Sequence, residues 1–407
     1  MKNAIVGQSG GPTAAINATL AGVIKGVAKA HQSQIINHLY GMKNGLEGLT
    51  SEQFELLDGL FEDSASLDLL TTTPAAALGS CRLKLPKDLS DPLYDRIFAI
   101  LEKMDIGYLF YIGGNDSMDT TVKLSKAAKE RQFPLSVIGI PKTIDCDLCG
   151  TDHTPGYGSA AKYIAVTMSE IWRDTAVYTK PAVTIVEIMG RDAGWLTAAA
   201  GLSTYLTGTG ADYLYLPEVT FSMDKFLDDV REALKKHPNV VIAVSEGIKF
   251  ADGQYVGASA QSGAKDAFGH AYLSGTSKVL ENAVKEAIGC KVRSIELNLP
   301  QRCAAHLLSK TDIEESLAIG QAAVSSALAG HSGEMMVFSR VEGEGYRVDI
   351  HSVSVDTAAN HVRVVPPHFI SPQGNNVTDE CLAYIAPLIQ GEWPIVYQNG
   401  IPLHFHF

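Results

Sequence analysis

The turn at residues 140–147, Ile-Pro-Lys-Thr-Ile-Asp-Cys-Asp, carries a lysine, a hydroxyl group and two carboxylates. An apolar, strand-like run comes directly before it. In an open α/β sheet the ligand crevice lies outside the carboxyl ends of the strands, so polar residues at such an end indicate chemistry. We therefore expect a base, a charge anchor and a cation for an anionic substrate from Lys142, Thr143, Asp145 and Asp147. The structural alternative is a polar loop that caps the next helix.

Two turns upstream also combine glycines with polar side chains after an apolar run. They are residues 7–13, Gly-Gln-Ser-Gly-Gly-Pro-Thr, and residues 113–117, Gly-Gly-Asn-Asp-Ser. Paired glycines let backbone N–H groups approach a phosphate, and a following helix N-terminus adds partial positive charge. Neither is a Walker A loop or a G-x-G-x-x-G fingerprint, and a tight turn, or an N-cap at Asp116 or Ser117, would also explain them. Three such turns in one chain favour one shared crevice lined for phosphate.

These turns, with others in the same order, resemble motifs of the phosphofructokinase family. The matching motifs are Gly10-Gly11, Leu78-Gly79-Ser80-Cys81-Arg82, Gly113-Gly114-Asn115-Asp116-Ser117, Pro141-Lys142-Thr143-Ile144-Asp145-Cys146-Asp147, Glu187-Ile188-Met189-Gly190-Arg191, Pro217-Glu218, Ser245-Glu246-Gly247 and Pro300-Gln301-Arg302. They run from about residue 3 to 312, and residues 369–378 resemble the longer, pyrophosphate-dependent branch. No single motif is sufficient, but the ordered set is highly specific.

The resemblance implies transfer of a phosphoryl group from pyrophosphate to the C1 hydroxyl of fructose 6-phosphate. The products would be fructose 1,6-bisphosphate and phosphate, in a reversible step of glycolysis and gluconeogenesis. Such a transfer needs positioning, charge neutralisation and a base for the hydroxyl proton. Asp145 is expected to be that base, with Thr143 orienting the substrate or the moving phosphoryl group. Arg191 would stabilise the negative charge of the transfer, together with Lys142.

The remaining site residues divide between the two substrates. A forked guanidinium suits a phosphate, so Arg302 is expected to pair with the 6-phosphate of the sugar. Glu246 would accept hydrogen bonds from sugar hydroxyls. The resemblance implies that the sugar phosphate is bound by Asp147, Met189, Gly190, Glu246 and Arg302, and the donor by Gly11, Arg82, Gly114 and Asp116.

Two residues favour pyrophosphate over ATP as the donor. ATP-dependent relatives have glycine at the positions of Asp116 and Lys142. Asp116 would fill the space of the nucleotide α-phosphate and place a like charge against it. Lys142 would supply the cation that a short pyrophosphate needs once the nucleotide is absent.

Magnesium is the expected metal, and Asn115 is its candidate ligand. Most relatives carry Asp at this position, but an amide oxygen can still bind a hard cation or its water. The metal would then be held more through pyrophosphate and water. Two further departures are Cys146, where Asn is usual, and Cys303, where ATP-dependent bacterial enzymes have glycine.

Composition excludes several other classes. A hydrophobic fraction of 46%, with 19% charged residues, is typical of a globular chain. A net charge of −12 argues against nucleic acid or an anionic membrane as a partner. No apolar run approaches the roughly 18 residues needed to span a bilayer, and no signal peptide is expected. Scattered cysteines indicate a reducing cytoplasm, although the pair Cys146 and Cys149 leaves a C-x-x-C redox motif as an alternative.

Strand and helix patterns alternate along the chain and predict an α/β fold with mainly parallel sheets sandwiched by helices. Strands are expected near 4–7, 34–38, 108–112, 135–140, 182–188, 212–216, 239–244, 292–296 and 335–339. Helices are expected, for example, at 14–30, 118–131, 158–174, 222–236 and 310–329.

The resemblance implies two domains with the active site in the cleft between them. A donor domain would comprise residues 1–156, completed by part of about 312–370, and a sugar-phosphate domain residues 157–311. Residues 371–407 would form a C-terminal extension that packs on the core. A homodimer or homotetramer is also expected.

Several functional alternatives stay open at this stage. An ATP-dependent 6-phosphofructokinase and a non-catalytic, regulatory relative share most of these motifs. A dinucleotide-binding oxidoreductase shares the alternation but lacks the G-x-G-x-x-G fingerprint. Sedoheptulose 7-phosphate is possible as an additional acceptor.

Overall fold

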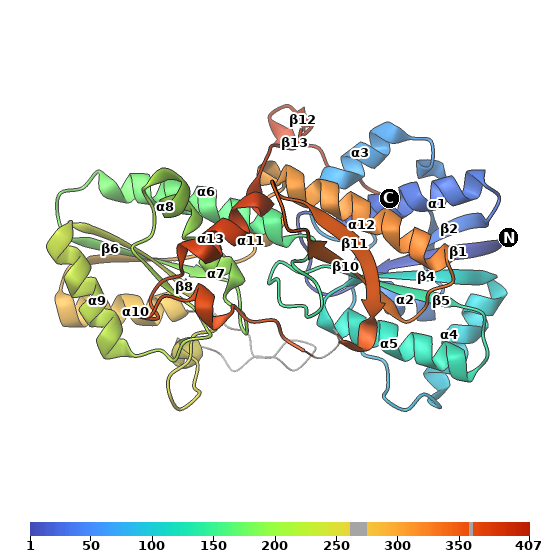
Figure 1. Cartoon of the computed structure of the whole chain (residues 1–407), viewed down its shortest axis with the longest axis horizontal. Coiled ribbons are helices and arrows are strands. Elements are labelled where there is room, and N and C mark those ends of the chain that lie inside the picture. Colours follow the sequence, from blue (N-terminus) through green and yellow to red (C-terminus); the bar gives the residue numbers. More distant parts are fainter. Residues whose placement is uncertain (261–274, 358–360) are drawn as a thin grey trace.

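The computed structural model describes residues 1–260, 275–357 and 361–407. Within these ranges the chain forms two main β-sheets, which occupy opposite halves of the molecule (Figure 1). Helices cover both faces of each sheet. This is the α/β architecture with mainly parallel sheets that the sequence predicts.

The larger sheet has seven strands in the order β11-β10-β5-β4-β1-β2-β3. The inner strands are parallel, whereas β3 and β11 pair antiparallel at the two edges. The bounds are β1 Lys2–Gln8, β2 Ile36–Met42, β3 Phe54–Leu56, β4 Ile106–Gly113, β5 Ser136–Pro141, β10 Glu334–Arg340 and β11 Val348–Ser354.

Alternate side chains of the larger sheet pack into two apolar layers, one on each face. Ala4 and Val6 of β1 pack toward one face, and Ile5 packs toward the other. The first face is covered by α1 (Ile16–Gln32), α3 (Ser64–Thr72) and α12 (Lys310–Leu328). The second face is covered by α2 (Gly45–Thr50), α4 (Pro92–Lys103) and α5 (Asn115–Glu130). Burial on both faces explains why the central strands β4 and β5 are almost continuously apolar.

Helices α1 and α12 approach each other unusually closely. A Cβ atom on Gly22 would lie 2.3 Å from the carbonyl oxygen of Leu317, and one on Gly320 would lie 2.3 Å from that of Thr19. Glycine is therefore required at both positions for this close packing. The contact fixes α1, which follows the first glycine turn, against the distant helix α12.

The smaller sheet has four parallel strands in the order β7-β8-β6-β9. Its strands are β6 Ala182–Ile188, β7 Tyr213–Tyr215, β8 Asn239–Ser245 and β9 Lys291–Glu296. One face is covered by α6 (Tyr157–Ala176), α7 (Trp195–Ala199), α8 (Leu202–Thr207) and α13 (Asp379–Ile385). The other face is covered by α9 (Met223–Lys236) and α10 (Thr276–Ile288).

Most expected elements are confirmed, with informative exceptions. Strand β2 begins two residues later than expected and extends to Met42. Helix α5 begins at Asn115 with Gly114 as its N-cap, so an N-cap at Asp116 or Ser117 is wrong. The elements not anticipated include β3, β11 and a short exposed hairpin of β12 (Tyr397–Gln398) and β13 (Ile401–Pro402). No helix within the described ranges is long and apolar enough to cross a membrane.

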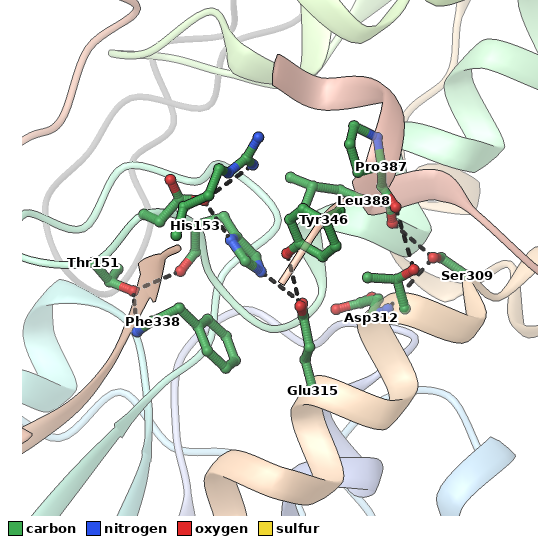
Figure 2. A network of polar contacts seen from close by, with 12 residues as sticks. Thr151, His153, Ser309, Asp312, Glu315, Phe338, Tyr346, Pro387 and Leu388 are labelled. Carbon is green, nitrogen blue, oxygen red and sulfur yellow. Dashed lines mark hydrogen bonds and ion pairs between the residues drawn. The ribbon is translucent and has the colours of Figure 1, made fainter. Parts of the chain in front are cut away.

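A buried polar cluster joins the loop after the 140–147 turn to α12 (Figure 2). The imidazole of His153 lies 2.7 Å from the carboxylate of Glu315 and 2.8 Å from that of Asp152. Its ring stacks on Phe338 of β10, and the hydroxyl of Tyr346 donates to Glu315 at 2.7 Å. The loop is thus held by contacts from three separate segments.

The C-terminal segment also contacts α12 and the loop before it. Ser309, at the N-cap of α12, donates from its hydroxyl to the carbonyl oxygen of Leu388 at 2.6 Å. Helix α13 packs against the smaller sheet's helices. These contacts are compatible with domain boundaries at 156/157 and 311/312 and with an extension from residue 371. All three boundaries stay predictions.

Candidate active site

Parallel strands bring their carboxyl ends to one edge of a sheet, and this places the candidate site. Strands β5, β4 and β1 are neighbours in the larger sheet, so the three turns that follow them lie side by side. The loops after β6, β8 and β9 lie at the corresponding edge of the smaller sheet. A cavity of about 680 Å³ is lined by residues from both sets of turns.

Every predicted site residue except Gly190 lines this cavity. The lining includes Gly11, Arg82, Gly114, Asn115, Asp116, Lys142, Thr143, Asp145, Asp147, Met189, Arg191, Glu246 and Arg302. Gly190 contacts a lining residue instead, because its N–H donates to the Glu246 carboxylate at 3.3 Å. The structure thus brings together residues that lie up to 291 positions apart in the chain, from Gly11 to Arg302.

The turn after β5 divides its side chains between the apolar core and the cavity. Cys146 is fully buried in the apolar cluster under the smaller sheet, whereas Asp145 and Asp147 line the cavity. Ile144 belongs to the same cluster and also lines the cavity. The hydroxyl of Thr143 accepts a hydrogen bond from the Asp145 N–H at 3.1 Å, which is a local turn contact of a kind typical for threonine. This arrangement aims both carboxylates at the same space.

Lys142 ties together the turns after β1, β4 and β5. Its side chain is almost fully buried, and its ammonium group donates to the carbonyl oxygen of Gly11 on the turn after β1. Its backbone N–H donates to the carbonyl oxygen of Gly113 on the turn after β4 at 2.9 Å. The lysine therefore holds the first turn and the second turn as well as supplying a cation.

Charges in the cavity perturb one another strongly. Burial lowers the pKa of Lys142 to about 8, and the charges of Arg302 and Arg82 contribute in the same direction against the opposing effect of Asp145. Burial, and then the charge of Arg82, also lower the pKa of Arg302. Three cations therefore gather where the donor turns meet, an arrangement suited to a ligand with several negative charges.

The carboxylates show the complementary effect. The pKa of Asp145 is raised because burial outweighs the favourable charges of Lys142 and Arg191. Burial and the neighbouring Asp145 charge raise the pKa of Asp147 to about 7 and that of Glu246 to about 8. Perturbed groups that converge in one cleft are typical of a functional site, and a raised carboxylate pKa suits a base that acts near neutral pH.

The loop after β8 shapes the side of the cavity that the smaller sheet contributes. A Cβ atom on Gly247 would lie 1.9 Å from the carbonyl oxygen of Arg191, so glycine alone allows the two loops to meet. The hydroxyl of Ser245 donates to the carbonyl oxygen of Gly190 at 2.5 Å. These contacts place the Arg191 and Glu246 loops side by side.

Asn115 is the residue best placed to contact a metal ion. Its side-chain N–H₂ donates to the Asp147 carboxylate at 3.3 Å, while its oxygen is buried and accepts no hydrogen bond from the residues described. Amide and carboxylate oxygens are ligands that a hard cation prefers. Among the described residues, His, Cys, Asp and Glu side chains form no group of three or more that could hold a metal ion. These residues therefore fit a cation whose remaining ligands would be phosphate oxygens and water.

Sequence reasoning missed three residues that the structure places at the site. Lys84 forms an ion pair with Asp116 at 3.1 Å, and its only signal was its position two residues after Arg82. Gln301 accepts a hydrogen bond from the Met189 N–H at 3.1 Å, and its place in the Pro-Gln-Arg motif could have identified it. Arg363 contacts the 140–147 turn from the C-terminal segment, and no local pattern indicates this.

The C-x-x-C redox alternative finds little support. Cys146 and Cys149 are both free thiols, and Cys146 is fully buried. Burial raises the pKa of Cys146 to about 11, so its reactive thiolate form is scarce near neutral pH. These cysteines are better described as loop thiols that pack beside the turn.

Comparisons with known proteins agree with this site. A family profile described as Phosphofructokinase matches residues 3–325. A protein of Xanthomonas campestris named pyrophosphate--fructose 6-phosphate 1-phosphotransferase is 42% identical over 404 residues, which cover 98% of this chain and 94% of that protein. A protein of the same name from Methylococcus capsulatus is 39% identical, with the same two coverages.

A solved structure is similar over nearly the whole fold. The crystal structure of a pyrophosphate-dependent phosphofructokinase from Nitrosospira multiformis has a TM-score of 0.88 and 37% sequence identity. The match covers 98% of this chain and 95% of that one. The profile, the relatives and the structural neighbour all agree with the motifs that line the cavity. This chain belongs to the phosphofructokinase family.

Proposed function

We propose that the chain transfers a phosphoryl group from pyrophosphate to the C1 hydroxyl of fructose 6-phosphate, reversibly. The observation that carries the proposal is the cavity in which Lys142 and Asp145, on one turn, face Arg191 and Glu246 from the other sheet. One wall supplies a cation and a base, and the other supplies a cation and a hydrogen-bond acceptor. This set meets the needs of phosphoryl transfer to a sugar hydroxyl.

In the forward direction, the C1 oxygen of the sugar attacks the terminal phosphorus of pyrophosphate, and Asp145 accepts the proton that the C1 hydroxyl loses. The bond between that phosphorus and the bridging oxygen breaks, and inorganic phosphate leaves with the bond's electron pair. Lys142 and Arg191 offset the negative charge that spreads over the moving group. In reverse, the protonated Asp145 returns its proton to the C1 oxygen. Its raised pKa supports both roles.

Binding of the sugar phosphate is assigned to residues from both walls. Glu246 and the Met189–Gly190 loop hold the sugar, with Asp147 nearby, and Arg302 pairs with the 6-phosphate. An ideal Cβ on Gly11 would lie 3.6 Å from the Arg302 guanidinium, so Arg302 also lies close to the donor turn. Donor contacts come from Gly11 and Arg82 and, after β4, from Gly114 and Asp116.

Magnesium is the proposed metal, with Asn115 and Asp147 as the residues that would hold it or its water. When bound, it would neutralise the phosphate charges that the carboxylates otherwise repel. The amide oxygen of Asn115, which is buried and accepts no hydrogen bond from the described part of the chain, supports this assignment. The raised pKa of Asp147 would fall once a cation lies beside its carboxylate.

Pyrophosphate is the proposed donor because Asp116 lines the cavity where a nucleotide would need space. The relatives named above carry the same donor in their names, which supports the assignment. The test is a side-by-side assay with pyrophosphate and with ATP, each with magnesium and fructose 6-phosphate, that measures fructose 1,6-bisphosphate. We expect turnover with pyrophosphate and at most a trace with ATP.

Other outcomes of this assay separate the alternatives. Preferential turnover with ATP would identify an ATP-dependent enzyme, and sugar-phosphate binding without turnover would identify a regulatory relative. The proposal includes the cytoplasm as its location, which six free cysteines support. It also includes a homodimer or homotetramer, which light scattering of the purified chain would check.

A further inference from the structure

The C-terminal segment at residues 361–365 runs alongside the 140–147 turn. Val362 forms an antiparallel bridge with Leu148, and the Arg363 N–H donates to the carbonyl oxygen of Asp147 at 2.7 Å. Val362 itself lines the cavity. A segment more than 200 positions away in the sequence thus returns to the residues that carry both carboxylates.

The Arg363 side chain contacts Cys146, which lies between the two carboxylates of that turn. One terminal nitrogen lies 3.4 Å from the carbonyl oxygen of Cys146 and 3.4 Å from its sulfur. The other donates to the hydroxyl of Tyr384 at 2.9 Å. The guanidinium carbon lies 4.1 Å from the ring centre of Trp195, which is a cation–π distance. These contacts leave the planar group little freedom to move.

Cys146 needs such support because of its backbone. Its φ angle is +56°, in the left-handed region that residues other than glycine and asparagine adopt only at a cost. This conformation places Cys146 in the apolar cluster while Asp145 and Asp147, on either side of it, both line the cavity. If Cys146 relaxed to an ordinary backbone angle, the two carboxylates would no longer share one direction.

The same segment is anchored to the loops of the smaller sheet. The indole N–H of Trp195 donates to the carbonyl oxygen of Arg363 at 3.0 Å. One carboxylate oxygen of Glu218 accepts from the N–H groups of both Val365 and Gly194, each at 2.8 Å. Arg363 therefore links the turn that carries Asp145 to the wall that carries the sugar-binding loops.

We propose that Arg363 is a positioning residue for phosphoryl transfer, which holds Cys146 in its left-handed conformation and so aims the carboxylates of Asp145 and Asp147 into the cavity. The inference rests on the proposed function. Arg363 does not line the cavity and therefore acts through the turn rather than on the substrates.

The main test compares Arg363→Met with a matched control, Arg340→Met. Arg340 also stacks on Tyr384, at 4.0 Å, and donates to the Asp152 carboxylate at 3.2 Å, but none of its hydrogen bonds to described residues goes to Cys146. Both variants lose a stacked guanidinium, so both should lower the unfolding temperature. Only Arg363→Met should lower kcat, by about 10-fold or more, with both KM values changed less than about 3-fold.

A double-mutant cycle tests whether Arg363 acts through Cys146. Cys146→Val is close in size, but its branched side chain disfavours a positive φ angle, so it should also lower kcat. If both changes disturb the same turn, their effects should not multiply. The kcat of the double variant should then lie within about 3-fold of the kcat of the slower single variant. Losses that multiply would show two independent effects and overturn the proposal.

A second readout does not depend on activity. Cys146 is fully buried, so its alkylation rate under native conditions, measured by mass spectrometry, reports opening of the turn. We expect alkylation at least about 10-fold faster in Arg363→Met than in the wild type or in Arg340→Met. An unchanged rate would overturn the proposal. A wild-type chain that is inactive with every donor would refute the proposed function, and the alkylation rates would still decide the role of Arg363.

Discussion

The carboxylate of Asp116 lies 3.1 Å from the ammonium group of Lys84, with both side chains partly exposed. Lys84 belongs to the same loop as Arg82, so the pair connects the loop after α3 with the start of α5. The ion pair occupies the donor side, next to the wall formed by Gly114 and Asn115. Asp116 therefore takes up volume at this wall of the cavity, and its carboxylate pairs with Lys84.

The first prediction concerns donor choice. Asp116→Gly should open the pocket, release Lys84 toward the donor and allow measurable binding of ATP or ADP, while pyrophosphate activity falls only partly. Lys142→Gly should reduce pyrophosphate turnover by ~10²-fold or more, because a charge-assisted contact to the moving group is lost. The double variant should shift preference toward ATP more than either single change. Specificity constants for both donors measure these effects.

Asp119→Gly is the control for this series. It removes a carboxylate from the same helix, one that pairs with Lys123 at 2.5 Å and does not line the cavity. Its donor preference should equal that of the wild type. A wild-type preference for ATP, or an Asp116→Gly variant without any gain in nucleotide binding, would show that the donor assignment is wrong.

The second prediction concerns the base. Asp145→Ala should lower kcat by ~10²–10⁴-fold, because the C1 hydroxyl proton then has no acceptor in place. Fructose 6-phosphate binding, measured by calorimetry, should largely survive. Asp145→Asn serves as the isosteric comparison and should be similarly inactive. Near-native turnover in either variant would exclude Asp145 as the base.

The third prediction separates the two substrates. Arg302→Ala should raise the KM for fructose 6-phosphate far more than the KM for pyrophosphate, because a bidentate phosphate contact is lost. Glu246→Gln should have the same selectivity with a smaller effect. Steady-state kinetics with each substrate varied in turn would measure both. Because Arg302 also lies close to Gly11, equal increases in both KM values would instead show that Arg302 does not serve the sugar phosphate alone.

The fourth prediction concerns stability and pH through the buried His153. Burial alone would lower its pKa, but hydrogen bonds and charges from Asp152 and Glu315 outweigh burial and raise the pKa to about 9. A group whose folded pKa is raised contributes stability at low pH and loses it as pH rises. The contribution, roughly 3 kcal/mol at most, should be complete below about pH 6.5 and lost as the pH rises through about 9.

Urea unfolding between pH 6 and pH 10 would measure this loss. In His153→Gln the loss over that window should be smaller by the contribution of His153, and the pH dependence that is left should come from the cavity groups Lys142, Asp147 and Glu246. His237→Gln is the control, since His237 forms its ion pair with Asp212 at the surface, and it should keep the pH dependence of the wild type. A wild type whose stability is constant across the window would contradict a charged His153.

The sequence by itself determined the strands that carry the site and the residues at their ends. The run at residues 240–244, Val-Val-Ile-Ala-Val, is apolar on both faces, and buried parallel strands favour that composition. The turn residues Gly11, Lys142 and Asp145 could be identified because chemistry at a strand end is encoded within a few consecutive positions. Edge strand β11 was missed because it is only partly buried and therefore carries polar residues, as in Val-Asp-Ile-His, instead of a continuous apolar run.

Only the tertiary structure decided which distant residues meet at these turns. The Arg363 contact with Cys146 spans 217 positions, and the His153 contact with Glu315 spans 162. No local periodicity specifies such pairs, because they depend on how the C-terminal segment and α12 pack on the sheets. The pKa values in the cavity depend on the same packing. Burial and the distances between charges set them, and both exist only once the two sheets face each other.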